Sequence, residues 1–165
     1  MTASTRILAG SSPHSVSVEI DSPQVQDILP HRGSALLVTN MVTVYNEAEP
    51  YRARTNLTVT DEHCAGHFGV MPGHLMTEAA AQLTGVLAHY YIGARGSGML
   101  RRECSEFRAM AQVGDRLTIT VTLTQHRKRG THHYVTATGV VVNQEGTFIA
   151  EFPEIVEVLT VEDHH

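Results

Sequence analysis

One apolar stretch limits what this chain can fold into. Between Leu75 and Leu87 the sequence is rich in Ala, Leu and Met, and only four polar side chains interrupt it. Pro72 suits the first position of a helix, because its missing N–H would have no intrahelical partner and its φ is already helical. We predict a helix from Pro72 to about Tyr91, ended by Gly93. A helix that is apolar on most sides must be buried, so the rest of the chain has to surround it.

The second half of the sequence supplies a sheet that can do this. Apolar residues at every second position from Leu117 to Leu123 alternate with threonines, which predicts a half-buried antiparallel strand. Residues 143–146 have the composition of a hairpin turn. The other predicted strands are Leu36–Tyr45, Arg52–Val59, Arg101–Met110, Tyr134–Val142, Thr147–Phe152 and Ile155–Thr160. We expect an α+β fold in which an antiparallel sheet wraps around one long central helix.

The N-terminal part of the chain divides into an arm and the start of a domain. Residues 1–18 show no periodic pattern and predict a flexible N-terminal arm, whereas residues 19–160 predict a single domain. A short helix is predicted over Pro23–Ile28 with Ser22 as its N-cap. It should stop at Leu29, because a residue before proline disfavours the helical region.

Size and charge exclude several classes of protein. A chain of 165 residues that is 42% hydrophobic fits one compact core. Its net charge of −5 argues against a nucleic-acid-binding protein, which would show a basic face. Cys64 and Cys104 match neither a zinc spacing nor a disulfide framework. No stretch approaches the ~18 apolar residues of a membrane span. We expect a cytoplasmic protein that binds neither nucleic acid nor membrane.

Glu78 is the first candidate for a functional residue. A carboxyl group in an apolar helix costs free energy unless it has a partner or a task. Gln82 lies four positions further on the same helical face, and His67 places an imidazole before the helix. If these residues have structural roles only, Glu78 would form a hydrogen bond to a neighbouring turn, and His67 would form one to a backbone carbonyl. Gln82 would then lie at a dimer contact. Since His63, His67 and His74 do not have a metal-ligand spacing, we expect no metal.

Four segments match a known family in the same order along the chain. They are Ile28-Leu29-Pro30-His31-Arg32, Gly66-His67-Phe68, Met71-Pro72-Gly73 through Gln82, and Phe107-Arg108 followed by Gly114-Asp115-Arg116-Leu117. With these segments the sequence resembles the hot-dog-fold 3-hydroxyacyl-acyl-carrier-protein dehydratases of fatty-acid and polyketide synthesis, over about residues 20–158. The resemblance implies the hot-dog fold, no cofactor, and an active site to which two subunits of a dimer contribute.

The resemblance also implies that His67 and Glu78 are catalytic. Dehydration removes the α-proton of a 3-hydroxyacyl thioester and expels its β-hydroxyl group. Neutral His67 suits the base, because imidazole titrates near neutral pH, and Glu78 suits the acid if burial keeps it protonated. The Gly73 amide at the helix start would polarise the thioester carbonyl. Gln82 would bond the carboxylate or the substrate, and His74 would have a structural or tunnel-rim role.

One departure from the family pattern concerns the loop after Phe68. Only Gly69, Val70 and Met71 separate Phe68 from Pro72. The loop is about three residues shorter than usual, which at about 3.3 Å per residue displaces the histidine by several ångströms. Two alternatives therefore stay open. The chain is a hot-dog acyl thioesterase whose helix carboxylate activates water, or a non-catalytic subunit of a heterodimeric dehydratase.

The expected partners follow from the same resemblance. The substrate would be an acyl chain linked to the phosphopantetheine of an acyl carrier protein, or an acyl-CoA. The basic cluster Arg127-Lys128-Arg129 is either solvated surface or a docking site for an acidic carrier. Because the sheet edges of a single unit need covering, we expect a homodimer or a heterodimer with a related hot-dog subunit. For His31 we expect a structural or tunnel-rim role.

Overall fold

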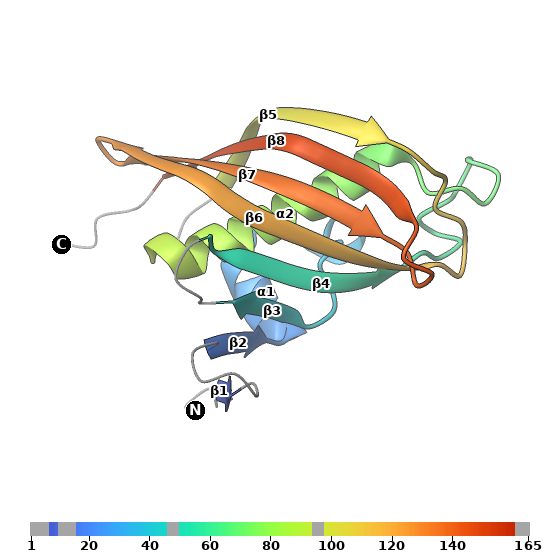
Figure 1. Cartoon of the computed structure of the whole chain (residues 1–165), viewed down its shortest axis with the longest axis horizontal. Coiled ribbons are helices and arrows are strands. Elements are labelled where there is room, and N and C mark those ends of the chain that lie inside the picture. Colours follow the sequence, from blue (N-terminus) through green and yellow to red (C-terminus); the bar gives the residue numbers. More distant parts are fainter. Residues whose placement is uncertain (1–6, 10–15, 46–49, 94–97, 161–165) are drawn as a thin grey trace.

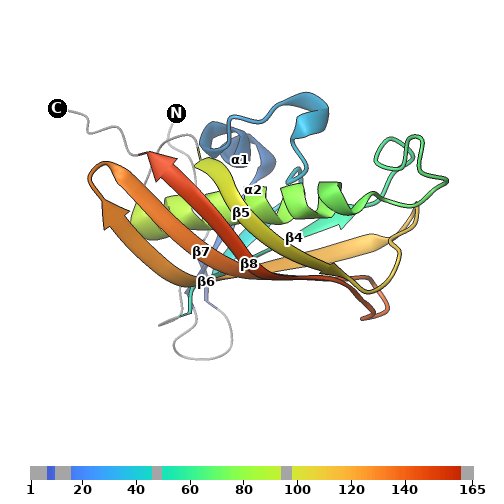
Figure 2. The ribbon, with the colours of Figure 1, turned by 90° about the horizontal axis from the view of Figure 1, so that it is seen from above.

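A long helix lies against one face of an antiparallel sheet in the computed structural model, which describes residues 7–9, 16–45, 50–93 and 98–160 (Figures 1 and 2). The helices are α1 (Ser22–Ile28) and α2 (Gly73–Ile92), with a 3-10 turn at Gly33–Ala35. The strands are β1 (Ile7–Ala9), β2 (Val16–Ile20), β3 (Val42–Tyr45), β4 (Arg52–Thr58), β5 (Gly98–Phe107), β6 (Arg116–Arg129), β7 (His132–Val142) and β8 (Phe148–Thr160). Their order in the sheet is β1-β2-β3-β4-β6-β7-β8-β5. This is the predicted α+β arrangement.

The central helix is enclosed by the sheet on one side and by α1 with its following loop on the other (Figure 2). Every residue from Ala79 to Ala88 is buried. Every second residue of β6 and β7 points toward the helix. The residues between them, which include the threonines, face outward. The alternation seen in the sequence therefore builds the core, as predicted.

Two predicted boundaries near the N-terminus are wrong. The N-cap of α1 is Asp21, because its side chain accepts from the Gln24 amide while the Gln24 side chain accepts from the Asp21 amide. This reciprocal capping box displaces Ser22 into the helix. The strand predicted over Leu36–Tyr45 is only Val42–Tyr45, since the backbone of residues 37 and 38 bonds a side chain of α2.

Two further boundaries differ in the rest of the chain. Pro72 is the N-cap of α2, whose first residue is Gly73. The two strands predicted at the C-terminus are one strand, β8, which passes through Pro153. The register between β7 and β8 shifts beside this proline, between Ala137 and Gly139, which is where a sheet tolerates a residue without an N–H.

The predicted N-terminal arm contains regular structure. β2 pairs with β3, and β1 pairs with β2, so the sheet begins before residue 19. Within the predicted flexible arm, Ile7–Ala9 and residues 16–18 therefore belong to strands. Residues 1–6 and 10–15 lie outside the described residues, and the division into an arm and one domain stays a prediction.

Strand β5 forms one edge of the sheet. Within the described ranges it pairs with β8 alone. Large apolar side chains are exposed on and just after this edge, namely Met99, Leu100, Phe107 and Met110. None of the helices in the described ranges has the length and apolarity that crossing a membrane requires.

Candidate active site

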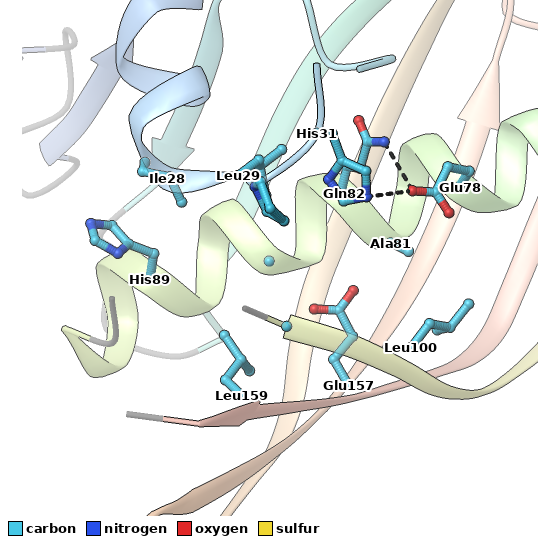
Figure 3. Close-up of a pocket in the computed structure, with 13 residues that line it drawn as sticks. Ile28, Leu29, His31, Glu78, Ala81, Gln82, His89, Leu100, Glu157 and Leu159 are labelled. Carbon is cyan, nitrogen blue, oxygen red and sulfur yellow. Dashed lines mark hydrogen bonds and ion pairs between the residues drawn. The ribbon is translucent and has the colours of Figure 1, made fainter. Parts of the chain in front are cut away.

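A pocket of about 100 Å³ lies between α2, β5, β8 and the loop that follows α1 (Figure 3). Its polar groups come from three side chains of α2 and one each from the loop and β8. The lining residues are Ile28, Leu29, Pro30, His31, Glu78, Ala81, Gln82, Gly85, His89, Gly98, Leu100, Glu157 and Leu159. The pocket thus brings together residues that are far apart in the sequence, and it includes Glu78 and Gln82 of the predicted site.

The Glu78 carboxyl group is held through one of its two oxygens. Its Oε1 accepts a hydrogen bond of 2.9 Å from Gln82 Nε2 and lies 3.2 Å from His31 Nε2. No contact to its Oε2 is seen in the described part of the chain, so this oxygen is available to a ligand. The side chain is 39% exposed, because it lies at the pocket mouth, so the burial that we expected for it is wrong.

Gln82 positions the Glu78 carboxyl group, and all of its hydrogen bonds are made to other groups of the protein. It is 2% exposed, and besides Glu78 its Nε2 donates to the Ala35 carbonyl at 2.6 Å. Its Oε1 accepts from the amides of Leu37 at 2.9 Å and Val38 at 3.3 Å. An amide side chain has two N–H donors and two acceptor lone pairs, and all four are used here. The predicted bond to the carboxylate is thus present, while no bonding capacity is left for a substrate.

His31 is the imidazole that contacts Glu78 within one chain. The turn that presents it is closed by Arg32, whose guanidinium donates to the carbonyls of Leu29 at 2.6 Å and His31 at 2.7 Å. The Nδ1 atom of His31 is buried without a partner among the described residues. A contact across 47 residues leaves no periodic signal in the sequence, so we expected only a structural or tunnel-rim role for this histidine.

His67 lies outside this pocket. It is exposed on a loop of consecutive turns that projects beyond the start of α2 (Figure 2). The next residue, Phe68, has a φ of 54° and is fully exposed, which is unfavourable for an aromatic residue in an isolated chain. His63, on the same loop, accepts from the Thr60 amide at 3.1 Å through Nδ1. One chain therefore does not bring His67 and Glu78 together.

Gly73 starts α2 under an aromatic ring. A Cβ at this position would lie 2.6 Å from Cζ of Phe107, so a larger residue fits only if this exposed ring shifts. The space left by the missing side chain is filled by that ring. His74, the next residue, is exposed and does not line the pocket.

Glu157 is a second carboxyl group in the pocket that sequence reasoning missed. It is 4% exposed on the inner face of β8. Burial, and secondarily the nearby Glu78 carboxylate, raise its pKa to about 8. The signal was available: Ile155, Glu157 and Leu159 share one face of a strand whose other members on that face are apolar.

Comparison with known proteins identifies the family. The FabA-like domain family matches residues 29–152, which is most of the chain. The chain belongs to the FabA-like family. A relative named 3-hydroxyacyl-[acyl-carrier-protein] dehydratase FabZ, from Rickettsia bellii (strain RML369-C), is 37% identical over 117 residues, which cover 66% of this chain and 78% of the relative.

Solved structures confirm the hot-dog fold predicted for this FabA-like chain. The dehydratase heterocomplex ApeI:P from Xenorhabdus doucetiae superposes with a TM-score of 0.63 at 19% identity, covering 84% of this chain and 91% of that one. Zebra fish thioesterase superfamily member 2 superposes with a TM-score of 0.58 at 17% identity, covering 86% and 95%. At these identities the likeness concerns the fold.

Within this FabA-like pocket, the geometry favours one kind of chemistry. Two N–H groups can donate to Glu78 Oε1, which makes it the acceptor oxygen when the carboxyl group is protonated. The proton then resides on Oε2, the oxygen that is open to a ligand. Such a group can donate a proton to a leaving oxygen at the pocket mouth.

Proposed function

We propose that this FabA-like chain dehydrates a 3-hydroxyacyl thioester to the trans-2-enoyl thioester, with the acyl chain linked to an acyl carrier protein. The observation that supports this most is the Glu78 carboxyl group, oriented by Gln82 and His31 with one oxygen facing the pocket. We further propose that it works in the cytoplasm, in fatty-acid or polyketide-type biosynthesis.

The proton on Glu78 Oε2 goes to the substrate's β-hydroxyl group. A base removes a proton from the α-carbon, and the electron pair of that C–H bond forms the double bond between the α- and β-carbons. The bond between the β-carbon and its oxygen breaks, and the oxygen leaves as water with the proton from Glu78. Stabilisation of the negative charge on the thioester oxygen falls to the Gly73 amide at the positive end of α2, and it requires the Phe107 ring beside Gly73 to move aside.

The base in this proposal is His67 of the partner subunit. A second copy is needed because His67 lies outside the pocket of its own chain. Two features support a dimer. The edge strand β5 exposes Met99, Leu100 and Phe107, and the loop next to the histidine exposes Phe68. Pairing two β5 edges would cover the first group and place each loop near the other subunit.

A basic groove on the outer face of the sheet suits an acidic carrier protein. Arg101 and Arg102 of β5 face Arg127 and Arg129 of β6 across a hollow of about 650 Å³. Lys128, also part of the predicted basic cluster, does not line it, because it points to the other face of β6. On a chain of net charge −5, such a local patch can attract the carrier and the phosphate of its arm.

The test replaces Glu78 by Gln and follows water loss from a 3-hydroxyacyl thioester. Loss of a general acid typically lowers kcat by about 10²–10⁴-fold, and Glu78→Gln should fall in this range. Glu145→Gln, which alters an exposed turn carboxyl group, is the matched control and should keep wild-type activity. Full activity of Glu78→Gln would refute the assigned role.

Hydrolysis of the thioester is the second candidate function. It is favoured by the position of His67 outside the pocket, because a carboxylate can activate water without an imidazole from another subunit. Release of free thiol from an acyl-CoA, without formation of an enoyl product, would distinguish it. Obligate capture of a related hot-dog subunit, with no activity of this chain alone, would instead identify a helper subunit of a heterodimer.

A further inference from the structure

The pocket contains a carboxyl group that the proposed reaction does not use. Glu157 lies on β8 opposite Leu100 of β5 and Val135 of β7, and it is 4% exposed. No hydrogen bond from its side chain is seen within the described ranges, and the carboxyl group borders the pocket. Burying a carboxyl group is unfavourable, so its presence in a mostly apolar wall needs a reason.

Two glycines leave open space beside this carboxyl group. Gly85 belongs to α2 and Gly98 to β5, and a Cβ at either position would lie 3.5 Å from Glu157 Oε2. That is ordinary van der Waals distance, so larger residues there would cover the oxygen. Figure 3 shows the Glu157 carboxyl group directed from β8 toward α2, into the space that the two glycines border. The carboxyl group is thus aimed into the pocket.

Glu78 and Glu157 lie at different positions along the axis of α2, because Glu157 faces Gly85 of this helix. Gly85 follows Glu78 by seven residues, which corresponds to about 10 Å along an α-helix. The rest of the pocket wall is mostly apolar: Leu100 lies opposite Glu157 on β5, and Leu159 lies two residues further along β8. A chain that reacts beside Glu78 and extends along α2 would reach the second carboxyl group within this apolar wall.

A protonated carboxyl group has one O–H donor and can also accept, so it suits a neutral hydroxyl or carbonyl group. The raised pKa of Glu157 keeps the group in this form near neutral pH. An anionic ligand would face both carboxyl groups, and a plain alkyl chain would leave the Glu157 O–H unpaired. His31 and His89 are the other titratable groups that line the pocket.

We propose that Glu157 selects substrates whose acyl chain has a neutral hydrogen-bonding group, a hydroxyl or a carbonyl, beyond the reacting β-carbon. This inference rests on the proposed function, because it places the reacting end of the chain at Glu78. It names the substrate class as oxygenated acyl thioesters, as opposed to plain alkyl ones.

The test measures binding with ligands that cannot react. Hexanoyl pantetheine and its analogue with a terminal hydroxyl group are made with an amide in place of the thioester, and their Kd values are measured by calorimetry. The wild-type protein should bind the hydroxylated ligand at least about 10-fold more tightly, since the alkyl ligand leaves a buried donor unpaired. Glu157→Leu should abolish this preference, whereas Glu157→Gln, which still donates and accepts, should keep most of it.

A control on the same strand separates this role from a general effect on folding. Glu154 lies on the outer face of β8, where it pairs with Arg102, and it does not line the pocket. Glu154→Gln should keep the wild-type ratio of the two Kd values. Equal binding of both ligands by the wild-type protein, or a preference that survives in Glu157→Leu, would overturn the proposal. A clear preference without any dehydration of a 3-hydroxyacyl thioester would refute the lyase function and leave this binding site standing.

Discussion

Replacing Glu157 by Gln should make the protein more stable at neutral pH and leave its stability unchanged at acidic pH. The Glu157 carboxyl group is buried, and its pKa is raised from 4.5 to about 8. Between these two values the folded state keeps a proton that the unfolded state has lost. The unfolded state therefore binds fewer protons, and stability falls as pH rises through this window. Glutamine has no such proton to lose.

The magnitude follows from the width of the window. Each pH unit in it costs about 1.4 kcal/mol, so the wild-type protein should lose roughly 3 kcal/mol between pH 5 and pH 7.5 relative to Glu157→Gln. Below the ordinary pKa of 4.5 the Glu157 carboxyl group is neutral in both the folded and the unfolded state. The difference in stability between the two proteins should therefore level off. His31, Glu78 and His89 line the same pocket, and they are present in both proteins, so their own titration largely cancels in the comparison.

The assay is urea unfolding at a series of pH values, with both proteins at the same concentration because a dimer's stability depends on it. The exposed Glu145→Gln serves as the control, and its difference from wild type should stay constant with pH. A difference between Glu157→Gln and wild type that does not grow between pH 5 and pH 7.5 would show that Glu157 is ionised in the folded protein. The reasoning about a neutral buried acid would then be refuted.

Three other variants test the packing and assembly of the site. Gly73→Ala should cost up to about 1 kcal/mol of stability, at the low end of overpacking effects, because its Cβ would meet the exposed Phe107 ring at 2.6 Å and displace it. The readout is Tm. Phe107→Leu in the same chain should recover part of the loss, and a Tm equal to wild type for Gly73→Ala alone would count against the contact. Gln82→Leu should lower the free energy of unfolding by roughly 2–4 kcal/mol, since it leaves the Leu37 amide and its neighbours unpaired. An unaltered midpoint of urea unfolding would contradict the assigned hydrogen bonds. Phe68→Ala should weaken self-association several-fold in sedimentation experiments, while an unchanged association constant would place the fully exposed ring outside the interface.

Most of the fold was predictable because its signals are local. The apolar run of α2 and the alternation in β6 each fix which face is buried, and Gly93, with its φ of 65°, ends the helix as expected. The errors arose where a distant residue decides the local structure. The backbone after Leu36 looks like a strand, yet the amides of Leu37 and Val38 bond the Gln82 side chain instead.

The site was predictable only in part, for the same reason. Gln82 was expected to bond Glu78 because the two are one helical turn apart, and it does. The contact between His31 and Glu78 depends on how α1 packs against α2, which no spacing in the sequence encodes. Glu157 was visible as a charged residue on the inner face of a strand, but its relation to Glu78 appears only once β8 and α2 are packed together.

The central claim is that Glu78 works with a histidine from a second subunit, and subunit complementation tests it most directly. His67→Ala and Glu78→Gln are each expected to be nearly inactive as homodimers. When the two variants are mixed and allowed to exchange subunits, half of the dimers are mixed and each of these has one intact site, so about one quarter of wild-type activity should return. Recovery to that level would support the shared site. A mixture as inactive as its components, although exchange has occurred, would contradict it.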